Sequence, residues 1–327
     1  MICPCACRDQ RGDPPGPFMF QASFCATASS LRRATALVGS IPRPTSRLQQ
    51  IQEHVSSKFH SSTPFAMPPV TPPTSEHYDL LVIGGGSGGM GASRRAASYG
   101  KKVAVIEEAG KLGGTCVNVG CVPKKLMWHA SDIQDKLKEA HEYGFTDAGR
   151  SFSVPSVDWH TLAEKRDAYI RRLNGIYDNN LQKDHVAYIS GHGRLLGDGR
   201  VQVTPGADGA LEKEVTLSAD HIVVATGGRP SIPSDDDIPG ASLGTDSDGF
   251  FAWREQPKRV AVVGAGYIAV ELAGVLHSLN SETHLLIRHD SFLRNFDPII
   301  SDTLMQYMGN TGLHVHKSTN VKRVEGE

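Results

Sequence analysis

Apolar and polar residues alternate in blocks from Tyr78 onward, and these blocks predict an alternation of strands and helices. Residues 78–83 form a short apolar run that ends in a row of glycines, which is typical of a buried strand followed by a tight turn. Residues 91–100 then predict a helix, and residues 101–108 predict a second strand. The same order of strand, glycine turn, helix and strand returns at residues 257–288. This repeated pattern indicates an α/β protein with parallel sheets.

The stretch between the two units predicts one long helix and a small group of strands. Residues 185–204 and 215–230 are apolar runs divided by glycine-rich turns, which predict short strands in a meander that caps the first unit. Residues 158–181 space their apolar side chains by three and four, as an amphipathic helix does. The apolar side of this helix comprises Trp159, Leu162, Ala163, Tyr169, Ile170, Leu173, Ile176, Tyr177 and Leu181.

The first glycine row has the spacing of a dinucleotide-binding turn. Gly84, Gly86 and Gly89 give G-x-G-x-x-G directly after a strand and at the start of a helix. Such a turn lets backbone amides approach a pyrophosphate and directs a helix N-terminus toward its charge. Glu107 ends the second strand, where a carboxylate accepts hydrogen bonds from an adenosine ribose. The alternative is an incidental glycine turn, which would not require the acid at this place.

The second turn has the same glycine spacing but different charge. Gly264, Gly266 and Ala269 follow the strand, and no acid ends the next strand. Arg288 and Arg294 stand there instead, which suits a ribose 2′-phosphate and therefore predicts NADP rather than NAD; the alternative is a solvated basic surface. One site has an acid for the ribose hydroxyls and the other has cations for a ribose 2′-phosphate. The two sites therefore imply two different cofactors, one of them a flavin. We therefore expect two Rossmann-like, doubly wound, three-layer dinucleotide-binding domains.

Composition and charge exclude several other functions. The chain has 327 residues, with 34 Lys and Arg against 35 Asp and Glu, so its net charge of -1 gives no reason to expect a nucleic-acid partner. No run of about 18 apolar residues predicts a membrane span. These features predict neither nucleic-acid nor membrane binding.

Residues 1–75 differ from the rest of the chain. They contain seven Lys or Arg and three acids, with many Ser, Thr and Pro, which is typical of a mitochondrial transit peptide. We therefore expect a mitochondrial matrix location, with a possible cytosolic form that starts at Met67. The alternatives are a disordered tail or an incorrect start of the reading frame. A metal site at the cysteines of residues 3–7 is disfavoured, because an import leader would be removed.

Cys116 and Cys121 lie five positions apart in a glycine-rich segment. Five residues of regular helix would separate them by ~7.5 Å, more than the ~4.4–6.8 Å Cα separation of a disulfide. The segment must therefore be irregular if the two sulphurs are joined. So short a ring adds little chain-entropy stabilisation and is readily reduced, which favours a redox-active disulfide over zinc ligands or two free core thiols.

The motifs together resemble the glutathione reductases, a branch of the two-dinucleotide-binding-domain flavoprotein disulfide reductase family. The resemblance extends from Tyr78 to the end of the chain and includes YDLLVIGGGSGG, KLGGTCVNVGCVPKKLMW, EKRDAYIRRLNGIY, HIVVATGGRPSIP and VVGAGYIAVELAG. It implies NADPH-dependent reduction of glutathione disulfide through FAD and a Cys116–Cys121 redox centre. It also implies a homodimer, and no metal. The cysteine segment alone is shared with other disulfide reductases, so a large-type thioredoxin reductase remains an alternative.

The resemblance also implies roles for single residues. Cys116 would attack the glutathione disulfide, Cys121 would lie next to the flavin, and Lys124 would pair with Glu271. The residues implied for FAD are Gly84, Gly86, Ser87, Gly88, Glu107, Thr115, Cys116, Lys124, Gly193, Thr226 and Gly227. Those implied for NADPH are Gly264, Ala265, Gly266, Tyr267, Ile268, Glu271, Arg288 and Arg294. Those implied for glutathione disulfide are Ser87, Arg94 and Tyr169.

We expect four segments along the chain. Residues 1–75 are the leader, 76–228 the FAD-binding domain with the redox disulfide, 229–256 a connection, and 257–327 an incomplete NADPH-binding domain. The resemblance implies that members of the family continue with the remainder of that domain and a C-terminal dimer-interface domain, and we expect this last domain to be absent here. We therefore also consider a truncated, catalytically inactive nucleotide-binding fragment.

Overall fold

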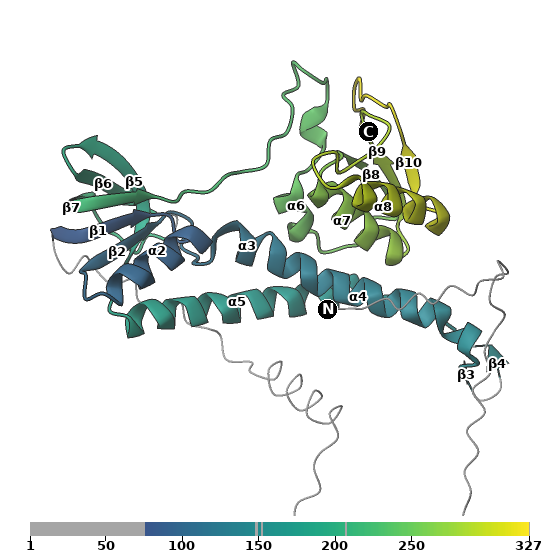
Figure 1. The fold of residues 1–327 in the computed structure, drawn as a ribbon, viewed down its shortest axis with the longest axis horizontal. Helices are drawn as coiled ribbons and strands as arrows, with labels where there is room; N and C mark the ends of the chain where they lie inside the picture. Colours follow the sequence, from purple (N-terminus) through teal and green to yellow (C-terminus); the bar gives the residue numbers. More distant parts are fainter. Residues whose placement is uncertain (1–75, 148–149, 152, 207, 327) are drawn as a thin grey trace, which may run out of the picture. The chain divides into compact units, whose positions relative to one another are not determined.

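The computed structural model describes residues 76–147, 150–151, 153–206 and 208–326 (Figure 1). The expected leader and the alternative start at Met67 lie outside the described residues. Of the domain limits expected above, none is tested by the structure, and they stay predictions. Among the helices of the described ranges, none is long and apolar enough to cross a membrane.

The first sheet is a closed ring of five strands. β1 (His77–Ile83) pairs in parallel with β2 (Val103–Glu107) and with β7 (Val215–Val224), and β2 pairs in parallel with β5 (Ala187–Gly197). β6 (Arg200–Pro205) closes the ring by pairing antiparallel with both β5 and β7. The long strands β5 and β7 thus belong to the parallel layer at one end and to the expected meander at the other.

Alternation along the parallel strands separates two hydrophobic cores. Leu81 and Ile106 point into the core between the parallel strands and the meander, together with Ile189 and Leu217. The neighbouring residues on the strands, Val82 and Val105 among them, point into a second core with Met90 and Leu181. The second core is covered by helices α2 (Ser87–Ala97) and α5 (Trp159–Lys183). Helices and meander on opposite faces of the sheet give the expected three layers.

Helix α2 begins earlier than the sequence pattern predicts. It starts at Ser87 within the glycine row, whereas the apolar pattern placed the helix at 91–100. The reason is that Gly88, Gly89 and Gly91 occupy helical positions without contributing to an apolar face. The start places the helix N-terminus directly at the glycine turn.

Two helices carry the cysteine segment. α3 (Gly114–Asn118) contains Cys116, and α4 (Cys121–Glu139) begins at Cys121. The helix break between them confirms the expected irregularity. After α4 the chain passes through the 3-10 helix η1 (Ala140–Tyr143) and the short hairpin β3 (Thr146–Asp147) and β4 (Arg150–Ser151) to α5. Asp158 caps α5 by accepting a hydrogen bond from the Thr161 backbone N–H at 3.1 Å.

The second sheet repeats the β-α-β order. β8 (Arg259–Val263) pairs in parallel with β9 (Glu282–Leu286), which pairs in parallel with β10 (His314–His316). Helix α7 (Tyr267–Ser278) connects β8 to β9, and α8 (Pro298–Thr311) connects β9 to β10. The 3-10 helix η2 (Ala241–Leu243) and helix α6 (Ser247–Ala252) precede this unit. Both sheets therefore agree with an α/β, Rossmann-like fold.

Candidate functional site

The first glycine turn is shaped by contacts that only glycine permits. Gly84 has φ +108°, and a Cβ there would lie 2.3 Å from the Ala225 carbonyl oxygen at the end of β7. A Cβ on Gly89 would lie 1.8 Å from the Gly84 carbonyl oxygen. The first glycine thus serves the turn and the third brings the helix onto the strand, as the G-x-G-x-x-G pattern requires.

Glu107 is held at the edge of this turn. Its Oε2 accepts a hydrogen bond from the Gly85 backbone N–H at 2.7 Å, and its Oε1 accepts one from the Ala109 N–H at 2.9 Å. A carboxylate has about four lone-pair positions, so further acceptor capacity remains for the hydroxyls of a ribose. The structure therefore places this acid where the sequence pattern expected it.

Other residues expected at the flavin lie around the same turn to different degrees. A Cβ on Gly84 would lie 3.1 Å from the Thr226 backbone nitrogen, so Thr226 borders the turn. Gly227 follows with φ +69° and has no neighbour within 4 Å of an added Cβ. Gly193, on β5, lies against Ile83 and Ile106 at the ends of β1 and β2. Ser87 and Gly88 are exposed at the start of α2.

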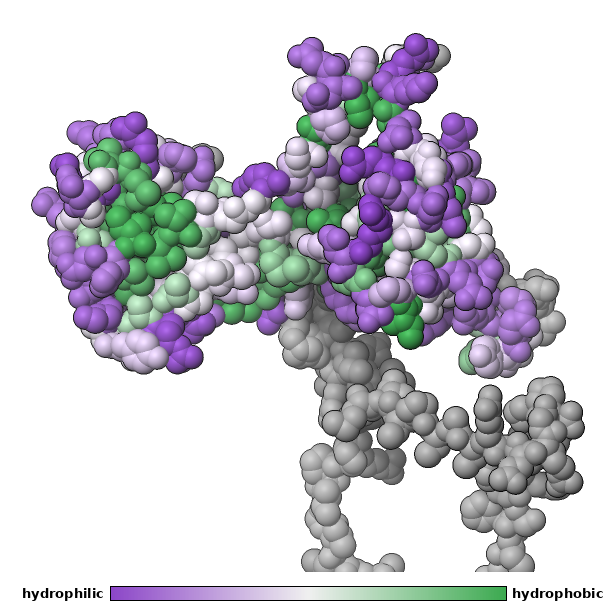
Figure 2. Space-filling model, turned by 45° about the horizontal axis from the view of Figure 1, so that its top comes forward, coloured by the Kyte–Doolittle hydropathy of each residue, from purple (hydrophilic) through white to green (hydrophobic). Residues whose placement is uncertain are grey.

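An apolar surface accompanies these polar groups. Val224 pairs with Ile83 at the last position of the β1–β7 register, directly before Gly84, and its side chain is exposed. Leu195 and Leu196 on β5 are exposed as well. Figure 2 shows a broad apolar area on the part of the molecule that contains the first sheet. Of these residues, Val224 lies beside the glycine turn, where an apolar side chain suits the flat rings of a dinucleotide.

The cysteine segment crosses over this glycine turn. The Gly113 N–H donates to the Gly85 carbonyl at 2.8 Å, and a Cβ on Gly114 would lie 2.6 Å from the Gly86 Cα. Thr115 and Cys116 follow directly, so the contact brings the redox candidates to the start of α2. The two backbones can approach this closely because both lack side chains at the crossing.

Two asparagines hold the same segment, and sequence reasoning did not single them out. Asn118 Nδ2 donates to the carbonyls of Leu112 and Gly114 at 3.2 and 2.9 Å. Asn174, on α5, donates to the Leu112 carbonyl at 2.8 Å and to Asn118 Oδ1 at 3.0 Å. The long helix thus fixes the loop that carries Cys116. The signal that could have found them is weak, because an asparagine in a helix pattern ordinarily faces solvent.

Cys116 and Cys121 are neighbours across the break between α3 and α4. Both are thiols in the structure; Cys116 is partly buried and Cys121 is exposed. Burial raises the pKa of the Cys116 thiol, and its side-chain hydrogen bond with Cys121 raises it further, while the Ser87 hydroxyl lowers it. The three side chains therefore form one group. The structure does not show the expected disulfide, which stays a prediction.

Lys124 and Glu271 come together from distant parts of the chain. Lys124 Nζ donates to Glu271 Oε1 at 2.7 Å, and both side chains are partly buried. Lys124 lies in the first turn of α4, just after Cys121, and Glu271 lies on α7 behind the second glycine turn. This ion pair joins the cysteine helix to the helix of the second unit.

The second glycine turn is built like the first. Gly264 has φ +149°, and its N–H donates to the Leu286 carbonyl at the end of β9 at 3.1 Å. Gly266 is the N-cap of α7, so the helix N-terminus faces the turn. Tyr267 and Ile268 are exposed in the first turn of the helix, whereas Ala265 packs against the core of the second unit.

Arg294 is brought to this turn by a backbone hydrogen bond. The Leu293 N–H donates to the Ala265 carbonyl at 2.8 Å, which places residue 294 beside the turn. Arg288 follows β9, next to the Leu286 carbonyl that binds Gly264. Both arginines are exposed, and within the described ranges neither forms an ion pair with a carboxylate. Two cations thus flank the second turn where the first turn has Glu107.

The residues expected to bind the disulfide substrate are only partly assembled. Ser87 and Arg94 line one shallow groove on α2, which Tyr177 and Asp184 complete. Arg94 Nε donates to Asp184 Oδ2 at 2.5 Å, a pair that sequence reasoning missed. Tyr169 is not part of this groove; its ring lies 6.0 Å from the Arg172 guanidinium. A substrate carboxylate at Arg94 would therefore have to share it with Asp184.

Comparison with known proteins gives a consistent result. A family model described as pyridine nucleotide-disulphide oxidoreductase matches residues 78–327. A glutathione reductase of Schizosaccharomyces pombe is 54% identical over 254 residues, covering 77% of this chain and 53% of the relative. Those of Yarrowia lipolytica and Debaryomyces hansenii are 53% and 46% identical, each covering 76% of this chain and 52% and 53% of the relative. The chain spans about half the length of these curated relatives.

The match covers both sheets, the cysteine segment and both glycine turns described above. The chain belongs to the pyridine nucleotide-disulphide oxidoreductase family.

Proposed function

We propose that this chain provides the nucleotide-binding and dithiol machinery for NADPH-dependent reduction of glutathione disulfide. The relatives reported above are named glutathione reductase, which supports the substrate. The observation that carries the proposal is the placement of Cys116 and Cys121 between the first glycine turn and the Lys124–Glu271 pair. The segment that carries the dithiol thus contacts the first glycine turn through Gly113 and Gly114, and the helix of the second unit through Lys124. The expected homodimer stays a prediction.

The residues of the first turn fit FAD, a cofactor of this family. The tight turn that Gly84 and Gly89 permit places the N-terminus of α2 where its backbone N–H groups can meet a pyrophosphate, and Glu107 retains acceptor capacity for a ribose. Ser87, Thr115 and Cys116 border the same place. FAD would supply a two-electron carrier that passes reducing equivalents from nicotinamide to the cysteines.

The residues of the second turn fit NADPH. The turn directs the N-terminus of α7 outward, and Arg288 and Arg294 offer guanidinium groups for a 2′-phosphate. Lys124, held by Glu271, lies three residues after Cys121 on α4 and would stabilise negative charge on this side of the dithiol.

The cysteines would perform the exchange steps. The overall reaction consumes NADPH, one proton and glutathione disulfide, and yields NADP⁺ and two molecules of glutathione. The Cys116 thiolate would attack one sulphur of the substrate, forming a mixed disulfide and releasing one glutathione. Cys121 would then attack Cys116 Sγ, releasing the second glutathione and forming the Cys116–Cys121 disulfide. Burial raises the pKa of Cys116 and so disfavours its thiolate, and a base that takes the proton would favour the attack.

Differential alkylation of the purified, air-oxidised chain tests the redox assignment. We expect Cys116 and Cys121 to be protected as a disulfide and to become alkylated together after NADPH is added, with FAD bound. The apoprotein without FAD should release neither thiol, because the nicotinamide alone does not reduce a disulfide at a useful rate. Two cysteines that react fully before NADPH is added would contradict the redox centre. Peptide mapping separates this pair from the four cysteines of residues 1–75.

Replacing Arg288 and Arg294 together by alanine should reverse the preference between nucleotides. Each guanidinium can make charge-assisted hydrogen bonds to the 2′-phosphate, and NADH lacks that group. We expect NADPH to bind at least about a hundredfold more weakly, since two such contacts contribute about 1.5 kcal/mol or more each, and NADH to bind nearly unchanged. Fluorescence titration with both nucleotides measures this. If the affinities for NADPH and NADH fell by the same factor, the arginines would not contact the 2′-phosphate.

A further inference from the structure

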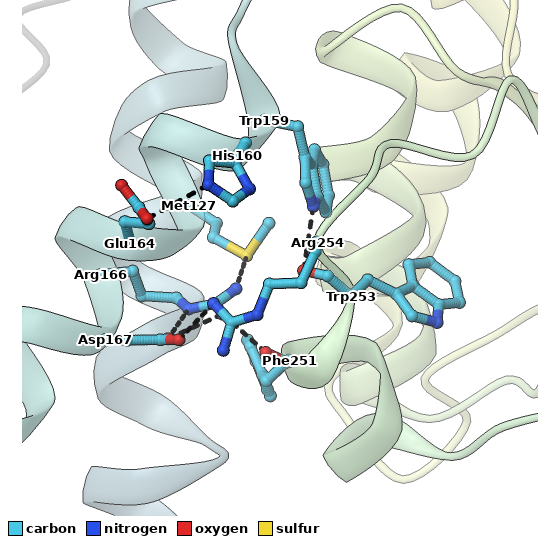
Figure 3. A network of polar contacts seen from close by, with 9 residues as sticks. All are labelled: Met127, Trp159, His160, Glu164, Arg166, Asp167, Phe251, Trp253 and Arg254. Atoms are coloured by element: carbon cyan, nitrogen blue, oxygen red, sulfur yellow. Dashed lines mark hydrogen bonds and ion pairs between the residues drawn. The ribbon is translucent and has the colours of Figure 1, made fainter.

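Arg166 is a buried cation on α5 that contacts three parts of the chain (Figure 3). Its guanidinium pairs with Asp167 Oδ1 at 2.8 Å, donates to the Phe251 carbonyl at 2.6 Å, and lies 3.5 Å from Met127 Sδ. The side chain itself is 0% exposed. Burying a charge is costly unless it is paired and hydrogen-bonded, and here the partners meet that requirement.

Asp167 extends the contact to the segment that leads into β8. Its second oxygen, Oδ2, accepts a hydrogen bond from Arg254 Nη1 at 2.6 Å. In the same region Trp159 Nε1 donates to the Trp253 carbonyl at 3.3 Å. Residues 251–254 are therefore bound to α5 through one buried cation, one shared carboxylate and one indole. The polar network in Figure 3 connects α5 to the end of α6 and the residues after it.

The contact with Met127 links this network to the cysteine helix. Met127 lies three residues after Lys124 on α4, so the two side chains leave the helix on neighbouring positions of one side. Its side chain is fully buried in a core shared with Phe251 and with Leu272 of α7. Leu272 is the residue after Glu271. Arg166 thus lies behind the α4–α7 contact that brings Lys124 to Glu271.

We infer that Arg166 is a positioning residue, which together with Asp167 and Arg254 holds α4 and α7 in the placement at which Lys124 reaches Glu271. The expected effect on the reaction rate rests on the proposed function. If that function is right, Lys124 lies between the dithiol and the unit that binds NADPH. A small displacement of reacting groups can cost about a hundredfold in rate. Loss of Arg166 should therefore slow electron delivery from NADPH to the cysteines, while thiol exchange at Cys116 and Cys121 stays intact.

The test compares Arg166→Met with Arg171→Met, an exposed arginine on the same helix, in chains loaded with FAD. We expect Arg166→Met to slow the NADPH-driven release of the Cys116 and Cys121 thiols about tenfold to a hundredfold, and Arg171→Met to leave it within about twofold. After reduction by dithiothreitol and desalting, both variants should release glutathione from its disulfide at the unchanged rate. Equal slowing of both half-reactions would overturn the inference and indicate a general folding defect.

A double-mutant cycle with Lys124→Met separates positioning from independent effects. If Arg166 acts through the Lys124–Glu271 pair, adding Arg166→Met to Lys124→Met should slow the NADPH step little further, by about twofold or less. If the double variant slowed the NADPH-driven step by the product of the two single slowing factors, the inference would be overturned. Arg254→Met provides a second route if Arg166→Met does not fold, because it removes only the outer cation and leaves the Arg166–Asp167 pair in place.

Urea unfolding of the same variants gives a reading that needs no activity. The midpoint shifts of Arg254→Met and Lys124→Met should be non-additive, although the two residues share no direct contact in the described structure. Additive shifts would contradict the inference. If the unmodified chain fails to reduce its cysteines with NADPH, the proposed function fails on that result alone. The unfolding cycle still decides whether the network of Arg166, Asp167 and Arg254 is coupled to the Lys124–Glu271 pair.

Discussion

Replacing Cys121 by serine should abolish catalytic reduction of glutathione disulfide while leaving one exchange step intact. Cys116 would still attack the substrate and release one glutathione, but no second thiol would resolve the mixed disulfide. We expect at most one glutathione released per chain and a loss of turnover of at least about a thousandfold, as for removal of other essential nucleophiles. Mass spectrometry of the intact chain should show the attached glutathione.

Cys116→Ser is the matched variant, and it should behave differently. It should lose turnover to the same extent but form no mixed disulfide, because the attacking sulphur is gone. The two cysteines are distinguishable in the structure, since Cys116 is partly buried beside Ser87 and Cys121 is exposed. If Cys116→Ser accumulated glutathione and Cys121→Ser did not, the two roles would have to be exchanged.

Gly89→Ala should damage the first nucleotide site far more than its size suggests. The added Cβ would lie 1.8 Å from the Gly84 carbonyl oxygen, so α2 or the end of β1 must move. Overpacking of this kind costs about 1–3 kcal/mol of unfolding free energy, occasionally more, and we expect the upper end because the obstacle is backbone. The same displacement would move the N–H groups that face the pyrophosphate, so FAD should be largely lost on purification.

Gly91→Ala is the control, two residues further along the same helix. An added Cβ there has no neighbour within 4 Å. Because glycine is unfavourable inside a helix, this substitution should stabilise the chain by up to about 1 kcal/mol. Urea unfolding and the absorbance of bound flavin measure both variants. If Gly89→Ala kept its bound FAD and its free energy of unfolding, the close approach of α2 to β1 would not be required for either property.

Much of the fold could be predicted from the sequence because the relevant signals are local. The glycine turns, the strands around them and the break between Cys116 and Cys121 each depend on a few consecutive residues. The apolar spacing of 158–181 predicted α5, and Trp159, Ala163 and Leu181 are indeed buried. Long-range polar contacts gave no such signal. The Arg94–Asp184 pair joins residues 90 positions apart, which no spacing rule connects.

Arg166 shows why a charged residue on an amphipathic helix is hard to interpret. The apolar pattern counts only apolar side chains, so a buried arginine is scored as part of the solvent face. Its burial depends on the Phe251 carbonyl and on Asp167, and the former becomes available only through tertiary packing. The same limit applies to Asn174, whose contacts with Leu112 and Asn118 lie 62 and 56 positions away. Polar positioning residues of this kind require the structure.

The ring of five strands also sets an order of events for the newly synthesised chain. β1 lies between β2 and β7, and its pairing with β7 joins His77 to Ser218 and Ile83 to Val224. The ring therefore cannot close until translation has passed residue 224, well after both cysteines have left the ribosome. Until then β1 exposes an unpaired edge, and such edges recruit other chains. The interval before β7 arrives is thus the period in which a chaperone would protect this protein most.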